Sequence, residues 1–574
     1  MLPHKQIELR LHAALRAVLP DADVSAVLVR PCPDLKFGDY QTNALMSVAK
    51  VRRMNPRQLA ADVLTRLDVS EWCEPVQIAG AGFLNFRLLP EALSRTLAGV
   101  VQSGHLFFEQ ATRPQTVVVD FSSPNVAKPM HVGHIRSTIL GDCLARTLRL
   151  LGHRVVTDNH IGDWGTQFGM LLLGWKTLLD RASLDREAIG ELERIYKSMV
   201  ERCKADPQQL ELAKRELVQL QGGDPENLGI WREMIRLSQI QFDTVYGRLG
   251  VKFDHTLGES FYNPKLQPLV GELVASGLAR ESDGAIAIFF DDIPQLKDNP
   301  ALIRKSDGGF NYATTDLATL AYRLETWKPD EIIYVTDGRQ QLHFQQVFTA
   351  FRKWHGQSTT KLAHVWFGSI LGEDGKPFKT RSGETVKLAG LLDEAQERAF
   401  KIVCEKSAAL PEAQRREIAR VVGLGAVKYA DLLPNRQSDY VFSWDKMLAL
   451  QGNTAPYLQY AYARIRSIFR KLGVGEYTAP HAAPDLKAPE EFILAKHLLN
   501  FGLTLEAVAE EHRPNFLCNY LHELAGKFTG FYENCPVLKA DDTTRASRLA
   551  LCDLTARVLK LGLETLGIET VEQM

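Results

Sequence analysis

The chain has no closely spaced cysteines. Its eight cysteines are scattered over 574 residues, and no two of them lie within four residues of each other. Zinc ribbons and redox-active pairs need two thiols at about that spacing. We therefore expect no zinc site, and free, buried thiols of the kind that persist in a reducing compartment.

A net charge of one sign and long apolar runs are also missing. The formal net charge is -1, so any nucleic-acid binding must come from local basic patches. No uninterrupted apolar run approaches the ~20 residues of a membrane span. The N-terminal stretch MLPHKQIELRLHAALRAVL alternates charged and apolar residues at helical spacing, unlike a signal peptide. The sequence predicts a soluble, cytoplasmic protein with no membrane partner.

A glycine-rich dinucleotide-binding loop is absent as well. In VQIAGAGFLNFRL, Gly80 and Gly82 begin such a motif, but Asn85 stands where the third glycine belongs and no long helix follows. This stretch predicts two short strands around a tight turn.

The pattern of apolar residues divides the chain into units. Residues 1–110 mix helical periodicity (7–19 and 56–67) with short strands and predict an α+β domain. From 111 to 385, β-branched runs alternate with helical segments, which indicates a parallel sheet covered on both faces. We expect insertions at 176–230 and 262–308, with a hairpin turning at Asp283-Gly284. Almost everything after 385 reads as helix, with a connector at 386–450, a final domain at 451–574 and a Pro/Ala-rich connection at 476–491.

The stretch SPNVAKPMHVGHIRSTILGD follows the apolar run TVVVDF and opens a long amphipathic segment. A helix N-terminus beyond the end of a sheet strand favours phosphate groups. Gly133 lets a flat group approach, His131 and His134 lie on one side of the first turn, and Lys128 adds a mobile charge. Donors fixed where charge develops suit a pentacoordinate phosphorus. The chemistry this predicts is attack of a substrate carboxylate on an α-phosphate, with pyrophosphate leaving.

Two other interpretations of the histidine pair stay open from these residues alone. A metal site is one, although the third ligand and the catalytic glutamate of helical metal motifs are missing nearby. A purely structural turn is the other.

HVGH after a strand resembles the HIGH signature of class I aminoacyl-tRNA synthetases. The longer stretch, with NHIGDWGTQFGML, YATTDLATLAYR, YVTDGRQQLHF, FKTRSGETVKL, VKYADLLPNRQSDYVFSWD and GNTAPYLQYAYARIRSIFRK, resembles the arginyl-tRNA synthetases over nearly the whole chain. The resemblance implies a Rossmann-type catalytic domain, an N-terminal domain that contacts the tRNA body and a helical anticodon-binding domain. It also implies ATP, L-arginine and the tRNA for arginine as partners, an arginyl-adenylate intermediate, Mg²⁺ with ATP, and a monomer.

The resemblance also suggests an arginine pocket. A guanidinium is a flat fork of donors, so its pocket should offer matching acceptors. Tyr312 and Asp316 match the family's side-chain pocket, and Gln340 matches a further contact. Ser123 and Asn125 match residues that hold the amino acid's own polar groups, and His134 is expected to touch both substrates. Without the resemblance, Asp316 would be interpreted as a helix cap.

Most of the family's ATP contacts have matching residues in this chain, but the loop that corresponds to the class's KMSKS signature departs from the class pattern. The matching positions are His131, Gly133, His134, Gly368, Lys379 and Arg381. The class carries a KMSKS loop, but KPFKTRSGET has no clear second lysine. Lys128 matches a lysine thought to compensate, so we expect Lys128, His131 and His134 to be catalytic.

The helix expected at YLQYAYARIRSIFRK carries basic and aromatic residues that suit unpaired bases and their phosphates. By family analogy Tyr457, Tyr460 and the terminal Met574 are expected near the anticodon. The alternative is a buried Tyr/Ile stripe with a solvated basic face. For the whole chain, the alternatives are another HxGH nucleotidyltransferase that acts without RNA and a catalytically silent tRNA-binding paralogue.

Overall fold

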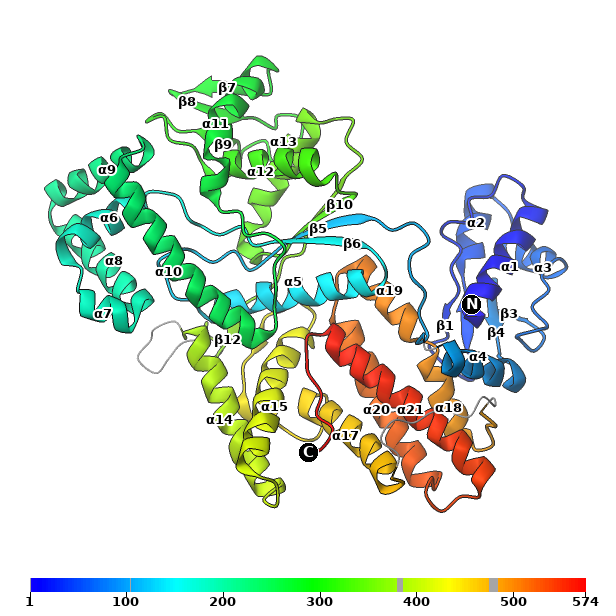
Figure 1. The fold of residues 1–574 in the computed structure, drawn as a ribbon. Helices are drawn as coiled ribbons and strands as arrows, with labels where there is room; N and C mark the ends of the chain where they lie inside the picture. The colour runs from blue at the N-terminus through cyan, green and yellow to red at the C-terminus, as the bar shows by residue number, and fades with distance from the viewer. Residues whose placement is uncertain (1, 104, 379–385, 474–483) are drawn as a thin grey trace.

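The computed structural model describes residues 2–103, 105–378, 386–473 and 484–574 (Figure 1). At its centre lies a four-stranded sheet in the order β11-β10-β5-β6, with every neighbouring pair parallel. The parallel sheet predicted from the β-branched runs is thereby confirmed. Its strands are β5 (Thr116–Asp120), β6 (Arg154–Asp158), β10 (Glu331–Tyr334) and β11 (Lys361–His364).

Both faces of this sheet are covered by helices, as the unbroken apolar runs predict. In β5, Val117 and Val119 join the hydrophobic cluster that contains Ile135 and Ile139 of α5 (Val132–Leu150). Val118 between them joins the opposite cluster, built on α12 (Tyr312–Trp327) and α13 (Gln341–Trp354). Successive residues of a strand point to opposite faces, so one strand supplies both cores.

Helix α5 lies unusually close to the end of β5 because it carries a glycine at the point of contact. A Cβ atom added to Gly141 would lie 2.2 Å from Cγ of Phe121. The fully buried Phe121 ring therefore fixes the distance between the helix and the strand.

The N-terminal unit packs four helices around an antiparallel sheet in the order β1-β2-β4-β3. The glycine-containing stretch forms β3 (Gln77–Ala79) and β4 (Phe83–Phe86), as predicted, and Gly80 takes φ +50° at the turn. The remaining elements are α1 (Pro3–Val18), β1 (Arg30–Pro31), β2 (Tyr40–Thr42), α2 (Ala44–Arg52), α3 (Pro56–Leu64) and α4 (Pro90–Ser103).

Two large segments are inserted between β6 and β10. The first is helical: α6 (Gln167–Leu178), α7 (Arg181–Arg186), α8 (Ala188–Ala205), α9 (Pro207–Gln221) and α10 (Pro225–Leu249). The second holds α11 (Glu259–Ala275), β7 (Ala279–Ser282), β8 (Ala285–Ile288) and β9 (Ala301–Arg304). The β7–β8 hairpin turns at Asp283 and Gly284, both with positive φ, as the Asp-Gly signal predicts.

The rest of the described chain is almost entirely helical, as predicted. After β12 (Ile370–Leu371), which pairs in parallel with β13 (Tyr440–Val441), the elements are α14 (Leu388–Lys406), α15 (Glu412–Leu432), α16 (Trp444–Met447), α17 (Ala455–Lys471), α18 (Pro489–Leu498), α19 (Phe501–Glu511), α20 (Asn515–Asn534) and α21 (Asp542–Thr565). The segment Pro489–Glu511 is long and apolar enough to cross a membrane. However, 56% of its most apolar stretch is buried inside the protein, as in an ordinary core helix. The first half of the predicted 476–491 connection, residues 476–483, lies outside the described residues.

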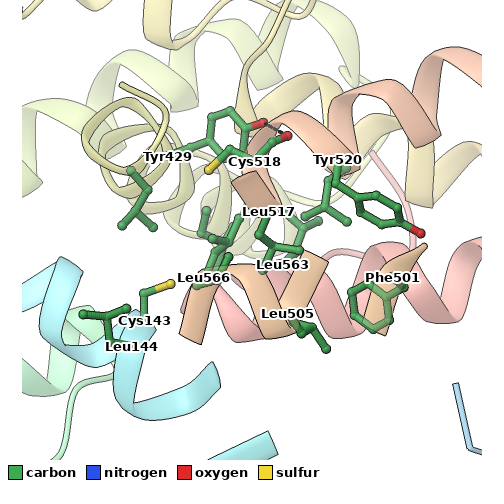
Figure 2. Packing of buried hydrophobic residues seen from close by; sticks show 14 of the residues in the cluster. Cys143, Leu144, Tyr429, Phe501, Leu505, Leu517, Cys518, Tyr520, Leu563 and Leu566 are labelled. Carbon is green, nitrogen blue, oxygen red and sulfur yellow. Dashed lines mark hydrogen bonds between the residues drawn. The ribbon is translucent and has the colours of Figure 1, made fainter. Parts of the chain in front are cut away.

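The helical C-terminal region shares one core with the parallel-sheet domain (Figure 2). Cys143 and Leu144 of α5 belong to the same buried cluster as Leu517 of α20 and Leu563 of α21. The Tyr429 hydroxyl of α15 donates to the Cys518 carbonyl at 2.8 Å. All eight thiols are free and seven of them are buried, which confirms the predicted burial.

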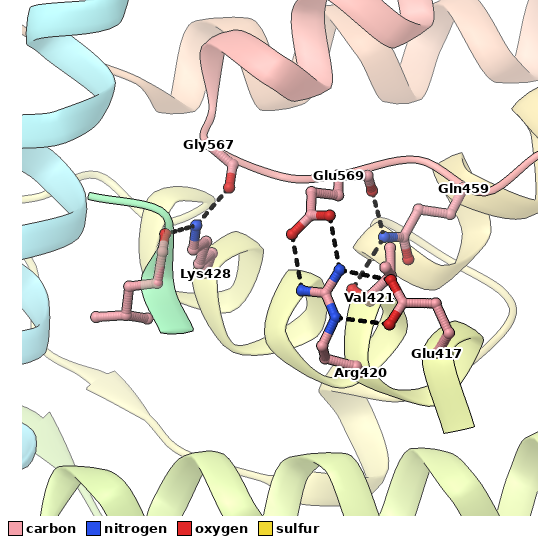
Figure 3. A network of polar contacts seen from close by, with 8 residues as sticks. Glu417, Arg420, Val421, Lys428, Gln459, Gly567 and Glu569 are labelled. Atoms are coloured by element: carbon pink, nitrogen blue, oxygen red, sulfur yellow. Dashed lines mark hydrogen bonds and ion pairs between the residues drawn. The ribbon is translucent and has the colours of Figure 1, made fainter. Parts of the chain in front are cut away.

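The last residues run back along α15 and α17 (Figure 3). Arg420 binds the Glu569 carboxylate at 2.7 and 2.9 Å, and Gln459 donates to the Glu569 carbonyl at 2.8 Å. The buried Lys428 donates to the carbonyls of Gly567 and Leu249. Burial lowers the pKa of Lys428 to about 8. One ammonium thus joins the C-terminal tail to the end of α10.

Candidate active site

The two imidazoles of the HVGH sequence cap the N-terminus of α5. Nδ1 of His131 accepts from the Gly133 N–H at 3.0 Å, and Nδ1 of His134 accepts from the His131 N–H at 3.1 Å. The ring centroids are 4.0 Å apart. Since each Nδ1 is an acceptor, each neutral ring carries its proton on Nε2. The pair therefore offers two N–H donors side by side, as the three-residue spacing predicts.

Both rings are neutral at physiological pH. Burial, followed by the neighbouring His131, lowers the pKa of His134 to about 3. Burial, followed by the positive charges of Arg339 and Lys128, lowers the pKa of His131. Such neutral donors stabilise developing negative charge without proton transfer.

The structural interpretation of the pair is partly right, because the rings do cap the helix. The metal interpretation gains no support: within the residues that the structure describes, no group of three or more His, Cys, Asp or Glu side chains is placed to hold a metal ion.

Lys128 lies just before the pair and is half-buried. Its ammonium is 4.8 Å from the ring centroid of Tyr196, which α8 contributes from the first insertion. This cation–π contact places the charge beside the helix N-terminus.

A cavity of about 470 Å³ opens beyond the carboxyl ends of β5 and β10. It brings together the predicted arginine contacts Ser123, Asn125, Tyr312, Asp316 and Gln340. They come from the loop after β5, the start of α12 and the turn before α13, which are up to 217 residues apart in sequence. The sixth predicted contact, His134, is not among the lining side chains and stays at the cap of α5.

Asp316 is not the cap of its helix. Asn311 is the N-cap of α12, and its side chain accepts from the Tyr312 N–H at 3.0 Å. Asp316 lies more than one turn further on, and its Oδ2 is 2.5 Å from Nε2 of His343 on α13. The capping interpretation of Asp316 is therefore wrong, because the carboxylate faces a neighbouring helix and the cavity.

Several lining residues were missed from sequence, namely Asp120, His160, Glu259, Thr336, Arg339, His343 and Phe344. Asp120 ends the first apolar strand, so its place at the ligand edge of the sheet was a usable signal. Glu259 begins α11 in the second insertion and has no such signal. Burial raises the pKa of Glu259 to about 7.

Beneath the cavity, one buried arginine pairs with two strand-end carboxylates. Arg323 of α12 is fully buried, and its Nη2 donates to Asp120 at 2.6 Å and to Asp158 at 2.8 Å. These attractions raise the pKa of Arg323 well above its usual value despite its burial. The triad ties α12, which carries Asp316, to the ends of β5 and β6.

The predicted ATP contacts are only partly described. The Gly368 carbonyl, just beyond β11, accepts from the buried guanidinium of Arg136 on α5 at 2.7 Å. Lys379 and Arg381 lie outside the described residues. Val386 lies beside the histidine pair, where its carbonyl accepts from the Val132 N–H at 2.9 Å.

The predicted anticodon residues lie on α17 and the C-terminal tail. Tyr460 is 45% exposed, whereas Tyr457 is half-buried with its ring 5.5 Å from that of His522. The buried stripe of the alternative interpretation is also present on α17, for example at Ile465. Arg466 and Arg470 bind Glu572 of the tail, and Met574 is half-buried.

Comparison with known proteins identifies the domains. Residues 96–444 match the model described as "tRNA synthetases class I (R), catalytic domain", 5–88 match "Arginyl tRNA synthetase N terminal domain" and 458–574 match "DALR anticodon binding domain". The chain therefore has the fold of a class I aminoacyl-tRNA synthetase.

Full-length relatives narrow this class to one amino acid. The arginine–tRNA ligase of Salmonella typhimurium strain SL1344 is 48% identical over 552 residues, which is 95% of each chain. The arginyl-tRNA synthetase structures from Plasmodium falciparum and Thermus thermophilus superpose with a TM-score of 0.84 each. Their identities are 30% and 28%, and at least 99% of each chain is covered. The chain belongs to the arginyl-tRNA synthetase family, so it is an enzyme that uses ATP to charge tRNA with L-arginine.

Proposed function

We propose that the cavity between β5, β10 and α12 is the L-arginine site. The observation that carries this proposal is the cavity lining, because three segments distant in sequence bring Asp316 and the other four predicted residues to one cavity. Asp316 accepts from the guanidinium, Tyr312 and Gln340 flank it, and Ser123 and Asn125 hold the α-amino and carboxylate groups. Acceptors matched to a guanidinium reject lysine, whose single ammonium leaves some of them unpaired.

The donors at the N-terminus of α5 form the second half of the proposed site. His131 and His134 direct Nε2–H groups at the α-phosphate of ATP, the Gly133 backbone admits the nucleotide, and Lys128 adds a full charge. Gly368, Lys379 and Arg381 complete the ATP contacts. The arginine carboxylate attacks the α-phosphate to give arginyl-adenylate and pyrophosphate, and the tRNA then takes the arginyl group and releases AMP.

Magnesium enters this proposal only as the ATP complex. The described residues contain no cluster that would hold the ion by itself, so we assign it to the phosphate oxygens of the nucleotide. No step depends on a protein-bound metal.

The tRNA for arginine spans the molecule in this proposal. The N-terminal domain (1–110) contacts the tRNA body, the catalytic domain (111–385) holds its acceptor end, and the connector (386–450) leads to the anticodon domain (451–574). Tyr457, Tyr460 and Met574 contact the anticodon side, and Tyr460 is the most exposed of the three residues. The enzyme works as a cytoplasmic monomer away from membranes, and sedimentation tests its state of association.

One assay tests the reaction and its alternatives. Arginine-dependent ATP–pyrophosphate exchange is measured with and without the tRNA for arginine. We expect exchange with L-arginine and not with L-lysine, and only when the tRNA is added. Exchange with no preference among amino acids would point to another nucleotidyltransferase, and the absence of exchange under every condition would point to a silent tRNA-binding paralogue.

A further inference from the structure

The loop that carries Ser123 and Asn125 has an unusual backbone. Three of its six residues, Ser122, Ser123 and Ala127, take positive φ values of 73°, 48° and 62°, and none of them is glycine. Residues with side chains persist in this region only where their surroundings hold them there. We call residues 122–127 the substrate loop.

Helix α10 of the first insertion holds both ends of the loop. Near the beginning of the loop, the Tyr246 hydroxyl lies 2.8 Å from Oγ of Ser122 and accepts from Nδ2 of Asn159 at 3.1 Å. Oδ1 of the same Asn159 accepts from the Ser123 N–H at 3.0 Å. At the other end of the loop, Oγ of Ser238 accepts from the Ala127 N–H at 2.9 Å. Tyr246 and Ser238 are eight residues apart, so they share one face of the helix.

This polar network is closed to solvent. Ser122 and Tyr246 are 5% and 4% exposed, and Asn159 and Ser238 are fully buried. Burial raises the pKa of Tyr246, so its hydroxyl keeps its proton and can donate to Ser122 while accepting from Asn159. A buried hydroxyl with partners on both sides fixes their geometry. Its removal leaves Nδ2 of Asn159 without this acceptor, and leaves Oγ of Ser122 with Thr138 as its remaining partner.

Resting on the arginine site proposed above, we propose that Tyr246 and Ser238 are positioning residues for the amino acid. Neither residue lines the cavity. They act through the backbone of the substrate loop, which they hold in the left-handed conformation that turns Ser123 and Asn125 toward the cavity.

The C-terminal end of α10 is held by contacts that do not involve the loop. The Leu249 carbonyl accepts from Lys428 at 2.5 Å, and the Gly250 carbonyl accepts from Arg146 of α5 at 2.7 Å. The Tyr246 ring also packs 5.0 Å from that of Phe253. Loss of one hydroxyl therefore leaves the helix and the ring in place, and any kinetic effect reports on the loop.

The test measures the steady-state KM for arginine and for ATP in Tyr246→Phe and Ser238→Ala. We expect the KM for arginine to rise at least tenfold in Tyr246→Phe and at least threefold in Ser238→Ala, with the KM for ATP within twofold. Thr244→Val, which loses an exposed hydroxyl on the outer face of the same helix, should leave both constants unchanged. Since KM does not depend on the folded fraction, partial unfolding cannot mimic the result.

A double variant shows whether the hydroxyl acts through the loop. If Tyr246 works through Ser122, the rise in KM of Tyr246→Phe combined with Ser122→Ala is smaller than the product of the single effects. A KM for arginine within twofold of the parent in Tyr246→Phe, or equal rises for arginine and ATP, would overturn the proposal. If Asp316→Asn still loses arginine in that case, the arginine site itself stands and only the role of α10 is wrong.

Discussion

Replacing Asp316 by asparagine removes one charge from the proposed arginine site and almost nothing else. The amide has the size of the carboxylate and keeps an oxygen for Nε2 of His343. Truncating one partner of a buried, hydrogen-bonded charge pair costs about 2–5 kcal/mol. The Asp316 side chain is 18% exposed, which places the loss at the lower end, at about 2–3 kcal/mol. Arginine affinity is then expected to fall about 30- to 140-fold.

Isothermal titration calorimetry measures this directly, with L-arginine and ATP titrated separately. ATP affinity should stay the same, because the histidine pair that we propose binds the nucleotide lies at the cap of α5. Asp291→Asn is the matched control, since that carboxylate pairs with Arg280 on the exposed hairpin of the second insertion. An arginine affinity within threefold of the parent in Asp316→Asn would refute the assignment of the guanidinium to this carboxylate.

Three further changes test other parts of the molecule. Arg323→Met leaves its two carboxylate partners buried without their cation, and should lower the free energy of unfolding by about 3–5 kcal/mol in urea titrations; an unchanged midpoint would contradict the role of the triad. Lys128→Ala should lower the rate of tRNA-dependent exchange at least tenfold while Lys214→Ala, on the exposed surface of α9, does not; near-normal turnover would rule out Lys128 as the compensating charge. Burial lowers the pKa of His497 to about 4. As the pH falls from 6.5 to 4, the unfolded chain therefore binds a proton that the folded chain excludes. The free energy of unfolding then falls by about 1.4 kcal/mol per pH unit. His497→Gln keeps a donor for the Tyr520 carbonyl, and melting temperatures between pH 7 and 5 should depend less on pH in this variant. If the melting temperature changes with pH as it does in the parent, another group is responsible for the pH dependence.

The periodicity of apolar residues within single segments was enough to predict the main strands and helices. The β-branched runs, the stripe of α5 and the Asp-Gly hairpin are patterns within one element, and each took the predicted structure. The histidine pair was equally readable, because a three-residue spacing at a helix start leaves one geometry for both rings.

Contacts between distant segments were not readable in this way. Asp316 resembled a cap because its partner, His343, comes from another helix. The basic face of α17 resembled a free RNA surface, yet Arg466 pairs with Glu572, more than 100 residues later. Glu259 and Tyr246 carry no local signal, since only the folding of the insertions against the sheet places them beside the loop.

The strand order β11-β10-β5-β6 has a consequence for synthesis on the ribosome. Strands β5 and β6 are made early and can pair at once, but the other neighbour of β5 is β10, which begins roughly 210 residues later. At about 5–20 residues per second, the apolar edge of β5 waits about 10–40 s for its partner. An unpaired edge of this kind invites association with other chains. Nascent chains that stop inside the insertions should therefore depend on chaperones or aggregate, whereas chains that extend beyond β10 can close the sheet.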